Sequence, residues 1–389
     1  MTPGFYGYRR PDGRVGTRNH VLVVPTVICS SVVAERVATG AAPVAVALPH
    51  LAGCGQLGPD MALTHETLAA YCAHPNVGAV LVIALGCEQV IAQRLAETAR
   101  RHGKRAEILA IQSEGGTVRT TEKGTSIAQA LAGTLAGQER EWCHASELIL
   151  SLKCGGSDYT SGLASNPTLG RVTDRLVELG GSAVLGEIAE IMGAEHLLAA
   201  RAGHPAAATR LIQIITRVET EARALGLDIR GTQPSPGNIR GGLTTIEEKS
   251  LGATHKGGER ARMEDVVAYA GPITRKGLTV MDTPGLDVES VTGMVGGGAQ
   301  VVVFTTGLGT PTGNPIAPVI KITGNARTAR QMADNIDLDV SGIMDDSETL
   351  DDAATRLFDE VLEVASGRQT KAETLGHREF AIHRRNPTI

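Results

Sequence analysis

The sequence predicts an α/β protein with two domains, each built on a parallel sheet that carries helices on both faces. Short, almost continuous apolar runs alternate with longer helical patterns, and this order is typical of parallel sheets. The 389 residues are enough for two domains. Hydrophobic residues make up 42% of the chain but aromatic residues only 3%, so aliphatic side chains must form the cores.

The first domain is expected over residues 1–138, with a Rossmann-like order of alternating strands and helices. Its opening segment, residues 1–19, is polar and basic and should form a loop or hairpin in which Arg9 and Arg10 are solvated. We expect strands at residues 20–27, 43–48, 79–85 and 106–112, and helices at residues 31–38, 59–72, 89–102 and 125–136.

The second domain is expected over residues 145–389 and is also Rossmann-like, with a long Gly-rich insertion at residues 231–258. An insertion of this length without regular structure is usually functional. The tail from Thr370 should be peripheral or make oligomer contacts. We expect strands at residues 148–152, 183–187, 278–281, 300–305 and 318–323, and helices at residues 169–179, 194–201, 205–225 and 348–365.

Composition and charge exclude several classes of protein. The net charge of −5 gives no electrostatic reason to expect nucleic-acid binding. No apolar run is long enough to span a membrane, and the first residues do not form a signal peptide. The six cysteines are scattered rather than dense. These features indicate a reduced, cytoplasmic protein whose thiols are buried, metal-bound or catalytic.

The strand at residues 148–152 runs directly into Lys153-Cys154-Gly155-Gly156-Ser157-Asp158. Ligands of open parallel sheets bind outside the carboxyl ends of the strands. This motif therefore places an amine, a thiol, a hydroxyl and a carboxylate where a ligand would bind. Because the combination of strand, glycine, cysteine and polar residue occurs twice more upstream, we expect an enzyme.

Cys54, Cys87 and Cys154 each follow a strand and are flanked by glycine. Thiolates suit iron–sulfur clusters or zinc, and three cysteines converging from three loops would leave one metal position open for substrate. The alternative is that each is a small buried hydrophobic residue. Cys72 and Cys143 are expected to be inert.

Two carboxylates near strand ends are candidate bases. Glu187 follows the strand at residues 183–187, and it is either a base, a metal ligand or part of a solvated capping cluster with Glu190. Asp282 ends another strand and is a base, a ligand or a helix cap.

The insertion offers backbone N–H groups, hydroxyls and positive charge, and Arg pairs with carboxylates bidentately. We therefore expect it to bind an acidic substrate. The predicted substrate contacts are Arg18, Asn19, Ser157, Asp158, Asn238, Arg240, Thr244, Thr245 and Lys249.

Two other functions remain open at this point. Residues 53–58 match G-x-G-x-x-G, which favours a nucleotide-dependent oxidoreductase, although a lone match is weak. In the second alternative, the chain is a non-catalytic binding or regulatory subunit, and its partner performs the chemistry.

Seven motifs together resemble the altronate and galactarate dehydratase family, which also contains the large subunit of (R)-sulfolactate sulfo-lyase. The motifs are GTRNH (16–20), GCGQ (53–56), GCE (86–88), KCGGSD (153–158), PSPGNIRGGLTTIEEKSLG (234–252), MDTPG (281–285) and FTTG (304–307). The resemblance implies a lyase that eliminates water or sulfite from a sugar acid or related 2-hydroxy acid to give a 2-keto acid. It also implies ferrous iron, as an ion or a labile iron–sulfur cluster, or another divalent metal such as manganese or magnesium.

The fused dehydratases that this chain resembles carry an additional small β-rich N-terminal domain. We therefore expect a separate small β-rich partner subunit that docks where the basic segment from Arg9 to Arg18 emerges. A homo-oligomer is also expected. In this interpretation Lys153, Glu187 and Asp282 are the catalytic residues, and Cys54, Cys87 and Cys154 hold the iron.

Overall fold

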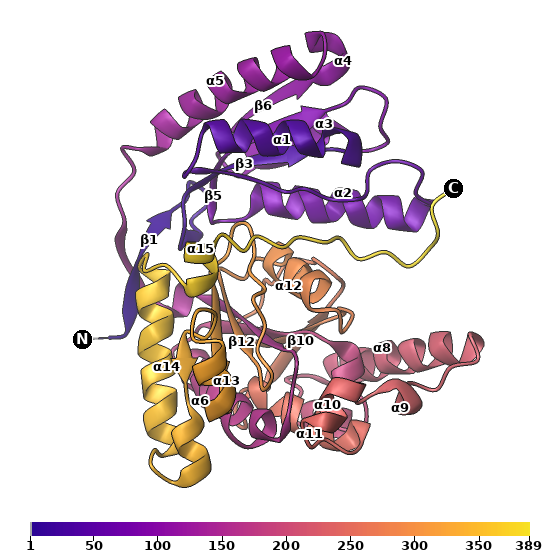
Figure 1. Cartoon of the computed structure of the whole chain (residues 1–389), viewed down its shortest axis with the longest axis vertical. Helices are drawn as coiled ribbons and strands as arrows, with labels where there is room; N and C mark the ends of the chain where they lie inside the picture. Colours follow the sequence, from indigo (N-terminus) through magenta and orange to yellow (C-terminus); the bar gives the residue numbers. More distant parts are fainter. Residues whose placement is uncertain (1) are drawn as a thin grey trace.

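The computed structural model describes residues 2–389 and shows an α/β protein with two parallel sheets (Figure 1). The smaller sheet has the strand order β4 (Ala45–Ala47), β3 (His20–Pro25), β5 (Val77–Ala84), β6 (Arg105–Ala110). The larger has the order β10 (Met263–Val267), β11 (Gly277–Met281), β9 (Ser182–Leu185), β8 (Ile149–Cys154), β12 (Val301–Thr305), β13 (Val319–Thr323), β14 (Leu338–Asp339). The prediction of an α/β protein with parallel sheets is confirmed.

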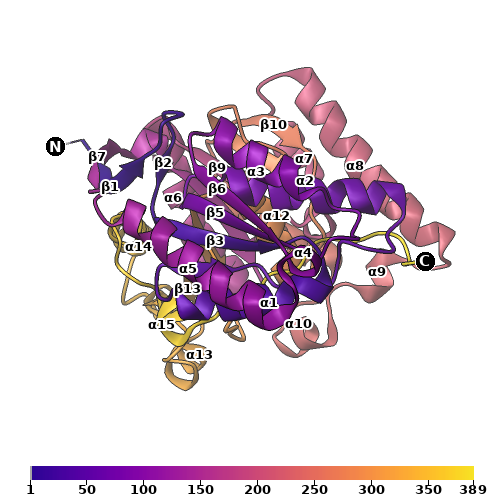
Figure 2. The ribbon, with the colours of Figure 1, turned by 90° about the horizontal axis from the view of Figure 1, so that it is seen from above.

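Helices cover both faces of the smaller sheet (Figure 2). On one face, α1 (Ile28–Gly40) and α5 (Thr117–Leu135) pack on each other and on the sheet. On the other face lie α2 (Gly58–Ala73) and α3 (Ala92–Arg101). The short α4 (Ile111–Glu114) follows β6. The strands are almost entirely apolar because both faces are buried.

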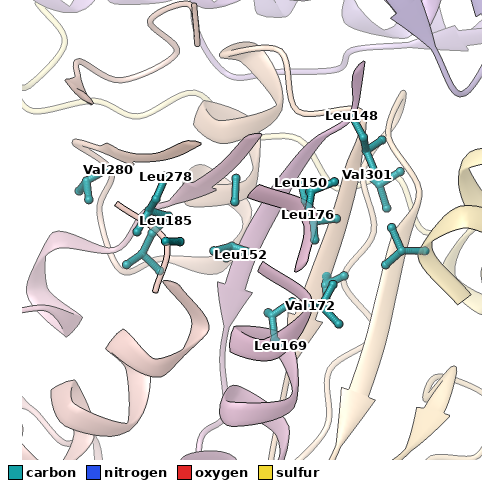
Figure 3. Close-up of a cluster of buried hydrophobic side chains, with 14 of the residues drawn as sticks. Leu148, Leu150, Leu152, Leu169, Val172, Leu176, Leu185, Leu278, Val280 and Val301 are labelled. Carbon is teal, nitrogen blue, oxygen red and sulfur yellow. The ribbon is translucent and has the colours of Figure 1, made fainter. Parts of the chain in front are cut away.

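Leucine and valine side chains fill the core between the larger sheet and α6 (Asn166–Glu178) (Figure 3). Leu150 and Leu152 of β8 lie close to Leu169 and Leu176 of α6, and all four are almost completely buried. Burying one such side chain contributes about 1.5–3 kcal/mol relative to its exposure. α14 (Leu350–Ala365) packs beside α6, whereas α12 (Asp287–Gly296) covers the opposite face near β8.

The two parallel sheets are joined by a shared core rather than by an open cleft. One hydrophobic cluster contains Leu68 and Tyr71 of α2, Val291 and Val295 of α12, and Phe304 of β12. Tyr71 Oη also donates to the carbonyl oxygen of Thr292, over 3.3 Å. The sequence did not indicate this contact, because α2 alone would serve equally well as a solvent-facing helix.

The N-terminal hairpin is confirmed. β1 (Gly4–Arg9) pairs antiparallel with β2 (Val15–Gly16) and with β7 (Glu141–His144) from the segment between the two sheets. The expected exposure of Arg10 is wrong. Its side chain is 5% exposed and donates to the carbonyl oxygens of Pro75 and Arg18, because the hairpin folds back on the end of α2.

The expected lack of regular structure at residues 231–258 is also wrong. The segment contains α10 (Pro236–Arg240), α11 (Ile246–Thr254) and the 3-10 helix η4 (His255–Gly257), and it follows α9 (Ile229–Thr232). Ser235 and Asn238 form a capping box at the start of α10, and Thr245 caps α11. Polar residues that suggested a flexible loop are therefore helix caps.

The C-terminal tail is not peripheral. It connects the first unit, which contains the smaller sheet, with the second unit, which contains the larger sheet. After α15 (Lys371–Leu375), the chain runs in extended form between the two sheets (Figure 1). The Phe380 ring lies 4.9 Å from that of Tyr71. The Asn386 amide donates to Asp60 of α2 over 2.7 Å, and the Ile389 amide donates to the carbonyl oxygen of Gly55 over 2.8 Å.

Further elements, all of them short except the 20-residue α8, complete the described chain. They are η1 (Ala145–Glu147), η2 (Ser161–Ser165), η3 (Ile188–Glu190), α7 (Glu195–Ala199), α8 (Pro205–Ala224), α13 (Ala326–Gln331) and η5 (Ser341–Asp345). Of these, η2 is a π-helical turn, a feature that is frequent at functional sites. Within residues 2–389, every helix is too short or too polar to cross a membrane.

Candidate active site

The end of β8 brings Lys153 and Cys154 to the carboxyl edge of the larger sheet, where both are buried. Lys153 Nζ lies 2.8 Å from Asp287 Oδ1 at the start of α12 and 5.4 Å from the centre of the Phe304 ring. A Cβ atom on Gly155 would lie 2.7 Å from the same Asp287 oxygen. Glycine is therefore needed here for Asp287 to approach the lysine.

Glu187 follows β9 in a strained backbone conformation. Its φ of 66° and ψ of 61° are left-handed, which costs a residue other than glycine about 1–3 kcal/mol. Thr283 holds this conformation by accepting the Glu187 N–H over 2.6 Å. The side chain is 1% exposed and pairs with both Lys153 and Lys256. Such strain persists at functional sites because the surrounding structure enforces it.

A second set of contacts extends the group towards α11. Lys256 Nζ lies 2.5 Å from Cys154 Sγ and 3.0 Å from Glu187 Oε2. Cys154 Sγ lies 2.9 Å from Glu190 Oε2, and Lys249 Nζ lies 3.0 Å from Glu190 Oε1. We call these six residues the buried charge group: Lys153, Cys154, Glu187, Glu190, Lys249 and Lys256.

Electrostatics within the group favour the charged forms of Lys153, Glu190 and Lys256. Burial alone would raise the pKa of Glu190, but the ammonium groups of Lys249, Lys153 and Lys256 outweigh it and lower that pKa to about 2. Burial acts to lower the pKa of Lys256, yet Cys154 and Glu187 raise it above its ordinary value. For Cys154, burial and the neighbouring carboxylates raise the pKa of the thiol. The group therefore holds a protonated thiol among paired charges.

Three members of the group could hold a metal ion. The ligand atoms of Cys154, Glu187 and Glu190 lie within 4.8 Å of one another, and all three residues are buried. One soft sulfur and two carboxylates fit a ferrous ion better than magnesium, which prefers oxygen ligands alone. All three side chains also contact ammonium groups, so a bound ion would replace some of those contacts.

A pocket of about 200 Å³ adjoins the buried charge group. Lys249 belongs to both, since it lines the pocket and its ammonium group contacts Glu190. The other lining residues come mainly from the loop after β8, from η2 and from α11: Ser157, Asp158, Tyr159, Ser161, Gly162, Leu163, Asn166, Leu243, Glu248, Gly252 and His255. A larger groove between α2 and α3 lies away from the group, at the surface of the first unit.

The structure brings together Lys153, Cys154, Glu187 and Lys249 among the predicted site residues. Ser157 and Asp158 line the adjoining pocket. The carboxylate of Asp158, however, already accepts hydrogen bonds from Thr160 and Ser161 and from Asn325 Nδ2 over 2.8 Å. The Asp158 carboxylate therefore stabilises the loop after β8, and its oxygens are already occupied by these hydrogen bonds.

Asp282 is not placed in the buried charge group. Both of its carboxylate oxygens lie 2.8 Å from the guanidinium group of Arg217 in α8, and Arg385 of the tail also contacts one of them. Its neighbour Thr283 instead reaches the group, through Glu187. Alternate residues of a strand point to opposite sides, so a shift of one position exchanges the two roles.

Residues of the insertion have mostly structural contacts. Thr244 bonds to Glu248 through its amide and hydroxyl, and Thr245 caps α11. Asn238 Nδ2 donates to the carbonyl oxygen of Ser157 over 2.8 Å, which ties α10 to the loop after β8. Arg240 is exposed and has no ion-pair partner among the described residues, so its guanidinium group faces solvent near the pocket.

Arg18 and Asn19 directly precede β3, so they lie at the amino edge of the smaller sheet. Ligands of parallel sheets bind at the other edge, beyond the carboxyl ends of the strands. Arg18 is 8% exposed, pairs with Glu373 and donates to the carbonyl oxygens of Val364 and Arg368. Asn19 bonds to Gln138 and Arg10. The expectation that Arg18 contacts substrate is therefore not supported.

Replacing Arg18 by Met is expected to lower the free energy of unfolding by up to about 3–5 kcal/mol, since Glu373, whose side chain is 20% exposed, would lose its partner. The kcat and KM of the folded protein should stay close to those of the unmodified chain. Urea unfolding and steady-state kinetics measure both effects, with the exposed Arg36→Met as control. A raised KM with unchanged stability would instead restore the role in substrate binding.

The three predicted iron ligands are not brought together. Cys54 and Cys87 are exposed on adjoining loops of the first unit, where the Gln89 amide donates to Gly53. Cys154 is buried in the charge group of the second unit. Among the described residues, Cys154, Glu187 and Glu190 form the only group of three or more possible ligands within reach of one ion.

Alkylation should separate the cysteines. In the native protein, iodoacetamide is expected to modify the exposed Cys29, Cys54 and Cys87 well before Cys154, because burial and the raised pKa disfavour the thiolate. Peptide mapping by mass spectrometry gives the order, and all six cysteines should react in guanidinium chloride. Equal rates for Cys154 and Cys87 would show that the charge group opens readily.

The rival nucleotide site is also disfavoured by the tail. In G-x-G-x-x-G loops, the middle glycine lets the backbone approach a pyrophosphate. Here a Cβ on Gly55 would meet the carbonyl oxygen of Ile389 at 2.8 Å, and the Ile389 amide bonds to Gly55. The C-terminal residue thus occupies the place where the cofactor would approach.

Sequence reasoning gave Lys256 only a general role as positive charge, and it missed Asp287 and Thr283 as neighbours of the site. A signal for Lys256 was present, since an uninterrupted helix from Ile246 would bring Lys249 and Lys256, seven positions apart, to one face. Asp287 had no such signal because its approach depends on how α12 packs against β8.

Buried lysine, glutamate and thiol side chains at the carboxyl edge of a parallel sheet define this protein as an α/β enzyme. Comparison with known proteins assigns its family. The family model described as "D-galactarate/Altronate dehydratase, C-terminal" matches residues 145–388, and "D-galactarate dehydratase/Altronate hydrolase, second domain" matches residues 7–136. The chain belongs to the galactarate and altronate dehydratase family, as its motifs indicated.

Curated relatives span the family's lyase reactions. The chain is 41% identical to "(2R)-sulfolactate sulfo-lyase subunit beta" of Chromohalobacter salexigens, over 98% of this chain and 97% of that one. It is 35% identical to altronate dehydratase of Bacillus subtilis, over 99% of this chain and 78% of that enzyme. It is 33% identical to "Galactarate dehydratase (L-threo-forming)" of Escherichia coli, over 97% and 76%.

Proposed function

We propose that the chain is the large subunit of a lyase that eliminates water, or sulfite, from a sugar acid or related 2-hydroxy acid to give a 2-keto acid. The observation that carries this proposal is the strained, buried Glu187 between Lys153 and Lys256. Elimination next to a carboxylate needs a base for the proton and positive charge for the developing enolate. The buried charge group contains both.

In the proposed reaction, Glu187 accepts the proton from the carbon next to the substrate carboxylate. The electron pair of that C–H bond forms a C=C bond, and the bond to the leaving group on the neighbouring carbon breaks. A leaving hydroxyl takes a proton from the ammonium group of Lys256 and departs as water, whereas sulfite departs with the electron pair of the C–S bond. The resulting enol then tautomerises to the 2-keto acid.

The lysines also position the substrate. Lys249 lines the pocket and therefore meets an entering carboxylate first, while Arg240 stands free at the surface nearby. Lys153 stabilises the negative charge that forms on the enolate. Its ammonium group is completely buried, and a fixed charge acts more strongly where water is excluded. Asp287, which is part exposed, keeps Lys153 paired while Glu187 is protonated.

Cys154, Glu187 and Glu190 would hold a divalent metal, for which we favour ferrous iron. When bound, such an ion supplies a Lewis acid for a leaving hydroxyl. We also propose that the chain consists of two Rossmann-like domains, at residues 1–138 and 145–389, and that the second carries this site. We also retain a partner subunit, which is supported by the "subunit beta" in the name of the sulfo-lyase relative.

The test is an assay of the purified chain under anaerobic conditions with ferrous iron, against altronate, galactarate and (2R)-sulfolactate. Release of 2-keto acid, detected as its hydrazone, supports the proposal, and release of sulfite identifies the leaving group. Each substrate is assayed with and without the companion subunit of the C. salexigens sulfo-lyase. Absence of turnover on all three acids in both conditions would overturn this substrate class.

A further inference from the structure

Large apolar side chains at the pocket and on the elements beside it are exposed to solvent. Tyr159 and Leu163, which line the pocket, are 52% and 62% exposed, and Ile239 of α10 is 56% exposed. Leu251 of α11 and Leu308 after β12 are exposed to a lesser degree. We call these five residues the apolar rim. Single exposed apolar residues are normal, but several around one pocket mark an interaction site.

Close approaches at glycines show that the elements carrying the apolar rim lie next to one another. A Cβ atom on Gly242 would lie 3.4 Å from the ring of Tyr159, and one on Gly237 would lie 3.7 Å from the side chain of Leu308. Ile239 lies between those two glycines in sequence. Gly162 and Gly252, the neighbours of Leu163 and Leu251, are also in direct contact. The segment after β8 therefore lies directly beside both α10 and α11.

The basic N-terminal segment does not offer a comparable surface, although the sequence suggested that a partner would dock there. Arg9 pairs with Glu141 and Glu147, Arg14 with Asp12, and Arg18 with Glu373. These charges are satisfied within the chain. The apolar rim is different, since its side chains remain exposed beside a pocket whose inner end is highly charged.

We propose that the apolar rim is the docking surface of a separate small polypeptide that closes the pocket. This rests on the proposed function, because closure matters for a reaction that develops charge: excluding water strengthens every electrostatic interaction in the site. The relative of nearly equal length is named a subunit, and the matched altronate and galactarate dehydratases are longer than the matched region.

The chemistry of the rim defines the partner's face. Five apolar side chains require an apolar patch on the partner, with aromatic or aliphatic anchors at its centre. Arg240 follows Ile239 in sequence, is exposed and has no ion-pair partner within residues 2–389, so a carboxylate of the partner should lie opposite it. A nucleic acid or a membrane would instead select a broad basic surface, which the rim lacks.

The test measures binding without substrate, so it succeeds or fails independently of turnover. The companion subunit of the C. salexigens sulfo-lyase is titrated into this chain by calorimetry. The unmodified chain should bind it with a micromolar or lower Kd, and Ile239→Asp and Leu163→Asp should each weaken binding by about 10–100-fold. The control is Leu225→Asp at the end of α8, which is 77% exposed and away from the rim.

Thermal unfolding of all three variants checks that the fold is intact, and ultracentrifugation of each chain alone measures self-association. No binding by the unmodified chain at 100 μM partner, or equal weakening by Leu225→Asp, would overturn the proposal. So would rim variants that abolish self-association but leave partner binding unchanged, because the rim would then join two copies of this chain. Binding at the rim without any turnover would count against the proposed reaction alone.

Discussion

Replacing Glu187 by Gln is expected to reduce kcat/KM by at least about 10²–10⁴-fold, the usual contribution of a positioned base. The amide has nearly the same shape but cannot accept the substrate proton. The same change should lower the free energy of unfolding by about 3–5 kcal/mol, because Lys153 and Lys256 would lose the carboxylate between them. Steady-state kinetics and urea unfolding measure the two effects.

The matched control is Glu178→Gln at the end of α6. Glu178 also pairs with a basic residue, Arg260 at 3.0 Å, but its side chain is 55% exposed. Exposed ion pairs contribute about 0.2–1 kcal/mol, so this variant should remain stable and active. If Glu187→Gln lowered stability but kept full turnover, Glu187 would be a structural counter-ion and another residue would be the base.

The parallel-sheet character was predictable from the sequence because it is encoded locally. A strand such as residues 79–85 is apolar along its length, and the structure has β5 at Val77–Ala84. The motif from Lys153 to Asp158 was likewise recognisable, since its lysine and cysteine follow a strand and its glycines mark a turn. Glu187 was recognisable for the same reason.

Features that depend on packing between distant segments were not predictable. Arg18 is buried because α15 brings Glu373 to it from the far end of the chain, and no local pattern reports such a contact. In the same way, β10 pairs with β11 at the edge of the larger sheet and the tail bonds to Asp60 of α2, and both contacts join segments distant in sequence or unmarked by a local pattern. Expectations for exposed basic residues therefore failed where the chain returns on itself.

The cysteines show a different reason for error. Their positions after strands correctly indicated sheet edges, but among the described residues only Cys154 lies with other possible metal ligands, because the relative orientation of the two sheets decides which loops meet. The orientation is set by the shared core of α2, α12 and β12, in which Tyr71 and Phe304 are completely buried. Sequence spacing within each unit contains no information about this angle, so the convergence of Cys54, Cys87 and Cys154 could not be tested in advance.

Combining Glu187→Gln with Lys256→Met is expected to cost less stability than the sum of the two single changes, by about 1–3 kcal/mol. Glu187→Gln leaves the buried Lys256 without the carboxylate that it pairs with at 3.0 Å, and Lys256→Met leaves Glu187 with Lys153 alone as its ammonium partner. The double variant removes both charges, while Lys153 keeps Asp287. Turnover should stay absent, because neither the base nor the positive charge is restored. Urea unfolding of the unmodified chain, the two single variants and the double variant measures this double-mutant cycle. Additivity within about 0.5 kcal/mol would show that Glu187 and Lys256 are not coupled. Recovered turnover in the double variant would exclude Glu187 as the base.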